Sequence, residues 1–431
     1  MATNLTKDVV THRSSTPTPN GTSKAAVHFP EDEGFSKSNL RFTEYERPTY
    51  LVSISPGCDQ DVVEIVKYAT DNDVPFSPRS GHHAVTTTMR HLKNGILIDM
   101  RSLNKLAFDA EKREVTVGGG VITDDFVKYL QSIGMEVSVI GVAFGAGLGR
   151  LQGKYGFLHD NMVSCRLVLA DGSVVLVSEE TNPDLFWALR GAEHNFGIAL
   201  EATFRVYPQA NAGIHYTWDL EYALDQCDAV FERLNAVSEN MPADLAVFVL
   251  WIRQSDSGRK NKILSKPEVW SRAPNKMMGA ACVEKFDLET TGGFFQSVRA
   301  MNEEWAGRGF FGAMFECLPH QRVSRQLPDD ATAFPWRWGS NHFLMLMATP
   351  VRLRDREAFE GHLDRWKKAF IATSGYGRLQ QYVNYGNTTS TMRDPPEALY
   401  GYESWRLDKL RALKKVYDPD NVFRWYQPLM E

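Results

Sequence analysis

This 431-residue chain has few cysteines, no long apolar run and little net charge. The five cysteines are odd in number and widely spaced, with no CxxC or Cys/His pattern, so neither a disulfide framework nor a zinc site is indicated. No apolar run approaches ~18 residues, which argues against a membrane span. The net charge of −5 is small for this length and favours neither a nucleic-acid partner nor an anionic membrane.

The N-terminal region lacks targeting features. It reads MATNLTKDVVTHRSSTPTPNGTSK, without the basic start and apolar core of a secretory signal. Together with the unpaired cysteines this predicts a cytoplasmic protein, while the oligomeric state is not indicated. Residues 1–40 are rich in Ser, Thr and Pro and lack periodicity, so we expect a disordered lead-in.

The remaining chain has the composition of a soluble globular protein, with 43% hydrophobic and 23% charged residues. Up to Pro208, short strands such as VPFSP and GILIDM alternate with amphipathic helices such as DQDVVEIVKYATDNDV. Beyond that point longer helices alternate with strands such as DLAVFVLWI and NHFLMLMATPV, which indicates an α+β region with an antiparallel sheet.

Three glycine-rich segments are candidates for a phosphate-binding loop: RSGHH (79–83), VGGG (117–120) and GVAFGAGLG (141–149). The last contains GxGxG but does not stand between the first strand and helix of a dinucleotide-binding unit. GxxxxGK[ST], GxSxG and HExxH are all missing, so nucleoside triphosphate, serine hydrolase and zinc protease chemistry have no support. Taken singly, each glycine-rich segment indicates a tight turn.

The order of the segments resembles the berberine bridge enzyme-like family of FAD-linked oxidoreductases, in the vanillyl-alcohol-oxidase-like superfamily. RSGHH resembles the family's RSGGH, and GILIDMRSLNKLAFDAEKREVTVGGG resembles the segment that follows it. GLGRLQGKYGFLHDNMVSCRLVLADGSVV and NPDLFWALRGAEHNFGIALEATFRVYP extend the similarity to Pro208. YVNYGN and LYGYESWRLDKLRALKKVYDPDNVFRWYQPL resemble the family's closing berberine-type segment.

This resemblance implies an α+β fold with four parts. After the lead-in, residues 41–208 would form a PCMH-type bipartite FAD-binding domain of two subdomains. Residues 209–380 would form a substrate domain, an antiparallel sheet with flanking helices. Residues 381–431 would be the berberine-type segment that returns to the FAD-binding domain.

The resemblance also implies the cofactor and its contacts. FAD would be linked through its 8α-methyl group to His83, or bound noncovalently, because His82 replaces a glycine of the family motif. A neutral imidazole is a competent nucleophile for such a bond. No cysteine lies between Cys58 and Cys165, so a second, cysteinyl link is excluded. The predicted cofactor-binding residues are Arg79, Ser80, Gly81, His82, His83, Gly141, Val142, Gly147, Leu148, Gly149, Asn161, Gly197, Ile198 and Asn384; no metal is expected.

Two tyrosines of the C-terminal YVNY segment are the implied catalytic residues. Removal of a hydride needs a base for the departing proton, and Tyr385 is favoured over Tyr382 as a phenolate. The tyrosine that some relatives carry in the glycine loop is Leu148 here, so a pair of tyrosine bases is not expected.

The predicted function is an FAD-dependent oxidase of a small organic secondary metabolite. Hydride would pass to flavin N5 and then O₂ would be reduced to H₂O₂, in an alcohol oxidation or an oxidative cyclisation. The alternative is a redox-neutral cyclase or isomerase, similar to a pericyclase, in which FAD is largely structural. A flavin-free binding protein on the same scaffold is a third interpretation.

Overall fold

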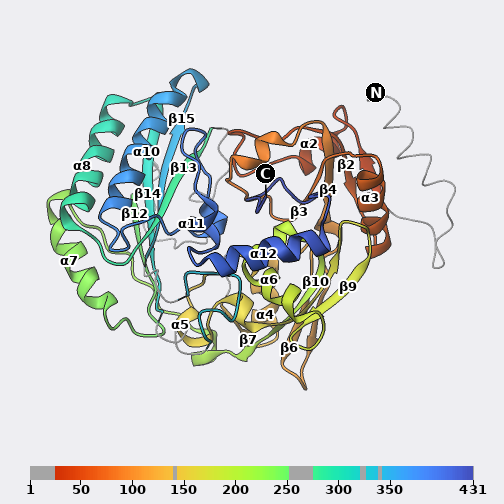
Figure 1. Ribbon diagram of the computed structural model, residues 1–431. Coiled ribbons are helices and arrows are strands. Elements are labelled where there is room, and N and C mark those ends of the chain that lie inside the picture. Colours follow the sequence, from red (N-terminus) through yellow and green to blue (C-terminus); the bar gives the residue numbers. More distant parts are fainter. Residues whose placement is uncertain (1–24, 139–142, 252–274, 321–326, 338–341, 431) are drawn as a thin grey trace.

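The computed structural model describes residues 25–138, 143–251, 275–320, 327–337 and 342–430. Strands and helices gather into two halves that lie side by side (Figure 1). One half holds every strand up to β11 (Tyr207–Pro208), and the other holds the sheet that follows in sequence. None of the helices in these ranges combines the length and apolar character that crossing a bilayer requires.

The first sheet has the order β1-β2-β4-β3, and its last three strands are parallel. The central β4 is buried along its whole length, as an apolar strand covered on both faces should be. α3 is amphipathic and buries Val62, Ile65 and Val66 in the core that this sheet shares. The elements are β1 (Ala26–His28), α2 (Glu33–Ser38), β2 (Tyr50–Ser55), α3 (Asp59–Asp71), β3 (Phe76–Arg79) and β4 (Gly95–Asp99).

The second sheet is antiparallel throughout, with the order β5-β6-β10-β8-β9. Its central strand β10 alternates buried and half-buried residues up to Thr203, and α6 contributes an almost entirely buried apolar run to the core of this sheet. These elements are β5 (Leu106–Asp109), β6 (Glu114–Gly118), α4 (Thr123–Ser132), β7 (Met135–Glu136), α5 (Gln152–Tyr155), β8 (Met162–Val168), β9 (Val174–Ser178), α6 (Pro183–Ala192) and β10 (Ile198–Arg205). The short β7 pairs with β11.

The third sheet is the antiparallel sheet predicted for the second half of the chain, with the order β12-β14-β15-β13. Three helices pack on one face and bury an aromatic core that includes Phe294, Phe315 and Phe359. The other face turns toward the first half of the molecule. The elements are α7 (Cys227–Ser238), β12 (Val247–Trp251), β13 (Met277–Val283), α8 (Leu288–Glu304), β14 (Gly309–Cys317), β15 (His342–Pro350) and α10 (Arg356–Ala372).

The C-terminal helices α11 (Pro396–Tyr400) and α12 (Ser404–Tyr417) return to the first half. Leu407 and Leu410 of α12 join the core of the second sheet. Fully buried Lys414 donates to the carbonyl oxygen of Asn195 at 2.6 Å and pairs with Asp418 at 2.6 Å. The C-terminal helices therefore lie against the first half of the molecule, and the predicted α+β fold is confirmed.

The expected lead-in is wrong for part of its length. Residues 1–24 lie outside the described residues, but β1 pairs with β2 and α2 follows it. Val27 and Phe29 pack against the core of the first sheet, and Phe35 is buried in a cluster of its own. Burial of these few apolar side chains orders a stretch whose average composition is polar.

Candidate functional site

The loop 79–83 begins where the parallel strand β3 ends, which is the edge at which open parallel sheets bind ligands. Arg79 is fixed by a bidentate ion pair with Asp99 at the same end of neighbouring β4, at 2.9 Å for both bonds. Ser80 Oγ donates to the carbonyl oxygen of Val121, at 3.1 Å. The loop therefore spans from the first sheet to the second, at the seam between the two predicted subdomains.

The VGGG segment is a packing feature. The N–H groups of Gly118, Gly119 and Gly120 donate to carbonyl oxygens of the protein itself. A Cβ on these residues would lie 2.3, 2.2 and 1.9 Å from the backbone oxygens of Leu103, Ala199 and Met100. The glycines allow two chain segments to touch, as the tight-turn interpretation predicted.

Gly81 differs from those glycines. Its N–H has no backbone partner among the described residues, and a Cβ there would meet only side chains of His83 and Ile122, at 3.1 Å or more. A half-buried loop with an unengaged amide at a strand end fits a pyrophosphate group.

His82 and His83 have different environments. His82 has a φ of 60°, a conformation that glycine adopts readily, and its ring is buried. Its Nδ1–H donates to the carbonyl oxygen of Leu40 at 3.0 Å, and its Nε2 accepts from Arg41 at 2.8 Å. The ring of His83 is exposed, 5.5 Å from the ring of Phe42. The His82 side chain is thus held by the protein, whereas that of His83 is exposed.

The glycine loop after β7 packs against the C-terminal segment. A Cβ on Gly145 would overlap the Asn384 amide at 2.4 Å, and Gly147 has a φ of 71°. Leu148 is buried in the core, and Gly149 N–H donates to Gln152 Oε1 at 3.2 Å. The predicted contacts Gly141 and Val142 lie outside the described residues.

Three other predicted cofactor contacts lie at the starts of strands β8 and β10 of the second sheet. Asn161 uses its amide to donate to the carbonyl oxygens of Tyr155 and Phe157, and accepts from Tyr207. A Cβ added to Gly197 would lie 2.4 Å from the carbonyl oxygen of Val168. Ile198 is buried at the start of β10. A cofactor contact at these positions stays a prediction.

The predicted catalytic tyrosines lie together. Their ring centroids are 5.0 Å apart at 81°. Asn384 donates to the hydroxyl of Tyr382 at 2.7 Å, and Tyr382 is buried. Tyr385 is half-buried, and its hydroxyl donates to Glu316 Oε2 of β14 at 3.2 Å.

The protonation state of Tyr385 differs from the predicted phenolate. Burial raises the pKa of Tyr385 well above its ordinary value, and the charge of Glu316 raises it further. Burial also raises the pKa of Glu316 to about 7, while the hydrogen bond from Tyr385 acts in the opposite direction. Tyr385 is thus a phenol that donates a hydrogen bond, and Glu316 is the group poised to accept a proton near neutral pH.

Methionine and phenylalanine surround the pair on the inner face of the third sheet. Buried Met278, Met314 and Met345 form a cluster with Phe42 and Val85, and Tyr385 packs against it. The half-buried members of this methionine cluster come from the same sheet: Phe248, Leu250 and Met347. Because Phe42 also contacts His83, the cluster lies beside the loop 79–83.

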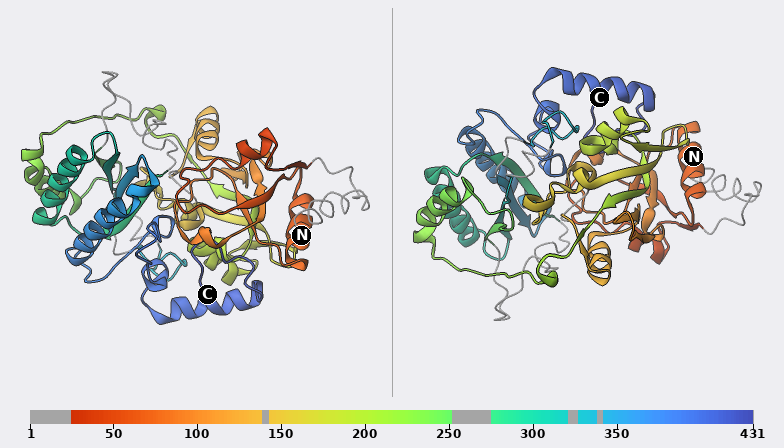
Figure 2. Two further views of the ribbon diagram at one scale, coloured as in Figure 1. Left: turned by 90° about the horizontal axis from the view of Figure 1, so that it is seen from above. Right: turned by 90° about the horizontal axis from the view of Figure 1, so that it is seen from below.

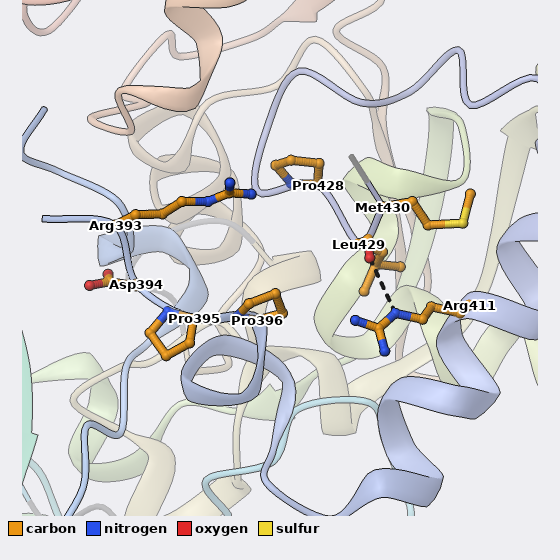
Figure 3. Close-up of a pocket in the computed structure, with 8 residues that line it drawn as sticks. All are labelled: Arg393, Asp394, Pro395, Pro396, Arg411, Pro428, Leu429 and Met430. Atoms are coloured by element: carbon orange, nitrogen blue, oxygen red, sulfur yellow. Dashed lines mark hydrogen bonds between the residues drawn. The ribbon is translucent and has the colours of Figure 1, made fainter.

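A separate cavity of about 570 Å³ lies by the C-terminal segment (Figure 3). Arg411 crosses it to donate to the carbonyl oxygen of Leu429 at 3.4 Å. Its acid, Asp394, is neutralised by buried Lys367. The eight lining residues provide no available base: Arg393, Asp394, Pro395, Pro396, Arg411, Pro428, Leu429 and Met430.

The fold and this arrangement define a flavin-dependent oxidoreductase, and comparison with known families gives the same answer. The family model "FAD binding domain" matches residues 51–178, and "Berberine and berberine like" matches residues 381–429. FAD-linked oxidoreductase alt4 of Alternaria solani is 61% identical over 95% of this chain and 94% of its own length. FAD-linked oxidoreductase fogF of Aspergillus ruber is 31% identical over 94% and 91%. The chain belongs to this family of FAD-linked oxidoreductases, and FAD is its cofactor.

Solved structures share the fold at low sequence identity. Glucooligosaccharide oxidase from Acremonium strictum superimposes with a TM-score of 0.79 at 17% identity, covering 99% of this chain and 98% of that one. BBE-like 1 from Physcomitrella patens gives 0.77 at 19%, with 99% of each chain covered. The Acremonium enzyme is described with a 6-S-cysteinyl, 8α-N1-histidyl FAD.

Sequence reasoning missed Glu316. The signal was available, because an acid within the apolar run of GFFGAMFEC is unusual for a buried strand. Its contact with Tyr385 joins residues 69 positions apart. Only the packing of β14 against the C-terminal segment brings them together.

Proposed function

We propose that this protein oxidises a weakly polar small organic molecule at a carbon bearing a hydroxyl group, with Glu316 as the general base. The supporting observation is the hydrogen bond from half-buried Tyr385 to the buried carboxyl of Glu316. The bound FAD supplies the hydride acceptor, and O₂ is the proposed oxidant that receives the electron pair and yields H₂O₂.

In this proposal Tyr385 and Glu316 act as one unit. The phenol orients the substrate hydroxyl, and the carboxylate takes its proton as hydride leaves. The raised pKa of Glu316 matches the carboxylate to proton transfer near pH 7. Tyr382 has a supporting role, since its hydroxyl already accepts from Asn384.

The cofactor is proposed to lie along the seam between the first two sheets. Gly81 would contact the pyrophosphate and His83 would carry the 8α link. His82 supports the link because its ring is held by Leu40 and Arg41 on the protein side of the loop. Acid precipitation followed by peptide mass mapping tests it: a flavin mass is expected on the peptide with His83, and an unmodified peptide with yellow supernatant would contradict it.

The proposed substrate class follows from the methionine cluster. Methionine is flexible and polarisable, and it suits irregular apolar ligands. A sugar would bury hydroxyl groups against this face without partners, which is unfavourable by roughly 1–3 kcal/mol per group. The substrate is therefore proposed to be apolar around its reacting hydroxyl, as a secondary metabolite would be.

A panel assay tests the function. Purified holoprotein is mixed with apolar primary and secondary alcohols and, separately, with oligosaccharides. We expect anaerobic bleaching of the flavin, and H₂O₂ with O₂ uptake in air, for members of the alcohol set. Turnover without flavin bleaching or O₂ uptake would instead support the redox-neutral cyclase or isomerase.

A further inference from the structure

The segment 214–222 carries an unusual row of exposed apolar side chains. It links β11 to α7 and reads IHYTWDLEY, with apolar and polar residues in strict alternation. The exposed fractions of the apolar side chains are 56% for Ile214, 72% for Tyr216, 77% for Trp218, 70% for Leu220 and 56% for Tyr222. Single exposed apolar residues are ordinary, but five in one row mark an interaction surface.

The segment runs as an extended chain and is not part of any assigned strand. The rings of Tyr216 and Trp218 stack with centroids 6.4 Å apart, the spacing of alternate residues on one side of a strand. No residue of 215–222 has a positive φ. In both views of Figure 2 the stretch, coloured yellow-green, runs extended from the FAD-binding half to the other half.

The apolar row is open to solvent, and the polar residues between its members are exposed as well. The segment touches its own chain through His215, whose Nε2 lies 3.8 Å from Glu136 of β7. Alternate side chains of a strand point to opposite sides. Residues 215–222 form no backbone hydrogen bond with any other residue of the described ranges, so within those ranges both edges of the segment are unpaired.

We propose that a second copy of this chain pairs with the segment as an antiparallel strand, with Trp218 opposite Trp218 of the other copy. An open edge with alternating side chains is a template for such pairing. The two-fold axis would pass between the two tryptophans, giving an isologous dimer.

In this register apolar residues meet apolar residues and polar residues meet polar residues. Ile214 faces Tyr222, and Tyr216 faces Leu220, so apolar residues meet only apolar residues. His215 faces Glu221, an imidazole opposite a carboxylate. Cross-strand aromatic–aliphatic pairs are among those that stabilise antiparallel ladders. An imidazole N–H can also donate a hydrogen bond to an opposing carboxylate. A shift by one residue would place apolar residues opposite acids.

The size of the apolar row also fits an interface. Each aromatic side chain offers about 200 Å² when fully accessible, so Tyr216, Trp218 and Tyr222 alone expose on the order of 400 Å². That equals the largest apolar patch of a typical monomer, about 300–600 Å², and such patches are often functional. The partner's matching row and ladder hydrogen bonds would cover the open edge.

Analytical ultracentrifugation of the full-length holoprotein, across roughly 1–100 µM, tests the dimer. We expect a monomer–dimer equilibrium that Trp218→Lys weakens at least tenfold, because a central aromatic anchor is lost and two lysines meet. Leu353→Lys is the matched control, an apolar residue 64% exposed elsewhere, and should leave the equilibrium unchanged. Flavin absorbance and circular dichroism verify that both variants fold.

Cross-linking tests the register without removing an apolar side chain. In a Cys58→Ser background, the double variant His215→Cys/Glu221→Cys should form an intermolecular disulfide with oxidised glutathione, because opposed Cα atoms lie about 4.5–5.5 Å apart. Each single variant should stay uncross-linked, since its two copies would be six residues apart along the ladder, about 20 Å.

Four results would overturn the proposal: a monomer at all concentrations, a dimer insensitive to Trp218→Lys, equal weakening by Leu353→Lys, or cross-linking of the single variants. A monomer that instead sediments with phosphatidylcholine vesicles would assign the row to a lipid surface and would also overturn it.

Discussion

Replacement of Glu316 by Gln tests the proposed base most directly. Burial raises the pKa of this carboxyl from 4.5 to about 7, a difference of about 3 kcal/mol in favour of the protonated form at 1.36 kcal/mol per unit. A base must be ionised, so kcat/KM of the native protein should rise tenfold per pH unit up to about pH 7 and then level off. Glu316→Gln should lower kcat/KM by about 10²- to 10⁴-fold and abolish this acid limb.

The assay is anaerobic stopped-flow reduction of the flavin by the best alcohol of the panel, over a range of pH. Tyr385→Phe supplies a second readout. It removes the hydrogen bond that lowers the Glu316 pKa, so the acid limb should move to higher pH. Infrared difference spectroscopy of the protonated carboxyl stretch follows the same titration without any substrate.

The control is the same isosteric change at Glu201 of β10, which pairs with Lys105 and Arg166 at the molecular surface. Glu201→Gln should leave kcat/KM and its pH profile unchanged. If Glu316→Gln kept native kcat/KM and the acid limb near pH 7, the proposed base would be wrong.

The remaining predictions concern the cofactor loop and the stability of the fold. His83→Ala should eliminate acid-stable flavin on mass mapping, whereas His82→Gly, which suits the φ of 60°, should retain it; loss of the flavin from both variants alike would contradict the division of roles. Lys414→Met should leave Asp418 buried without its partner and lower the free energy of unfolding by about 3–5 kcal/mol in denaturant titrations; a change within error would refute this. Gly120→Ala should lower the free energy of unfolding by about 1–3 kcal/mol, because the new Cβ would lie 1.9 Å from a backbone oxygen. Gly361→Ala in α10 has nothing within 4 Å of the new Cβ and should raise the free energy of unfolding by about 0.5–1 kcal/mol. Equal effects of the two variants in thermal melts would show that close approach is not the cause.

Local pattern was sufficient for many of the elements. The apolar run GILID predicts a strand buried on both faces, and β4 is such a strand. Pro183 stands at the start of α6, where proline is favoured, and the helix in WRLDKLRALKKVY ends before Asp418. These features depend on residues a few positions apart, whose preferences the sequence displays directly.

The local sequence pattern also led to a wrong prediction near the N-terminus. The polar average of residues 1–40 concealed β1 and α2, because a few apolar side chains determine order when a core is available to receive them. The sequence left the orientation of His82 undecided. Its ring is held by Leu40 and Arg41, more than 40 positions earlier in the chain.

The sequence by itself indicated the family, the FAD cofactor and the order of strands and helices. It also singled out the tyrosine pair of the C-terminal segment, whose catalytic role stays a prediction. Tertiary structure alone decided which of the candidate groups lie together. Glu316 reaches Tyr385 only because β14 packs on the C-terminal segment, and burial there gives the carboxyl its pKa near 7. Desolvation and long-range contact arise from the assembled fold, and no local pattern encodes them.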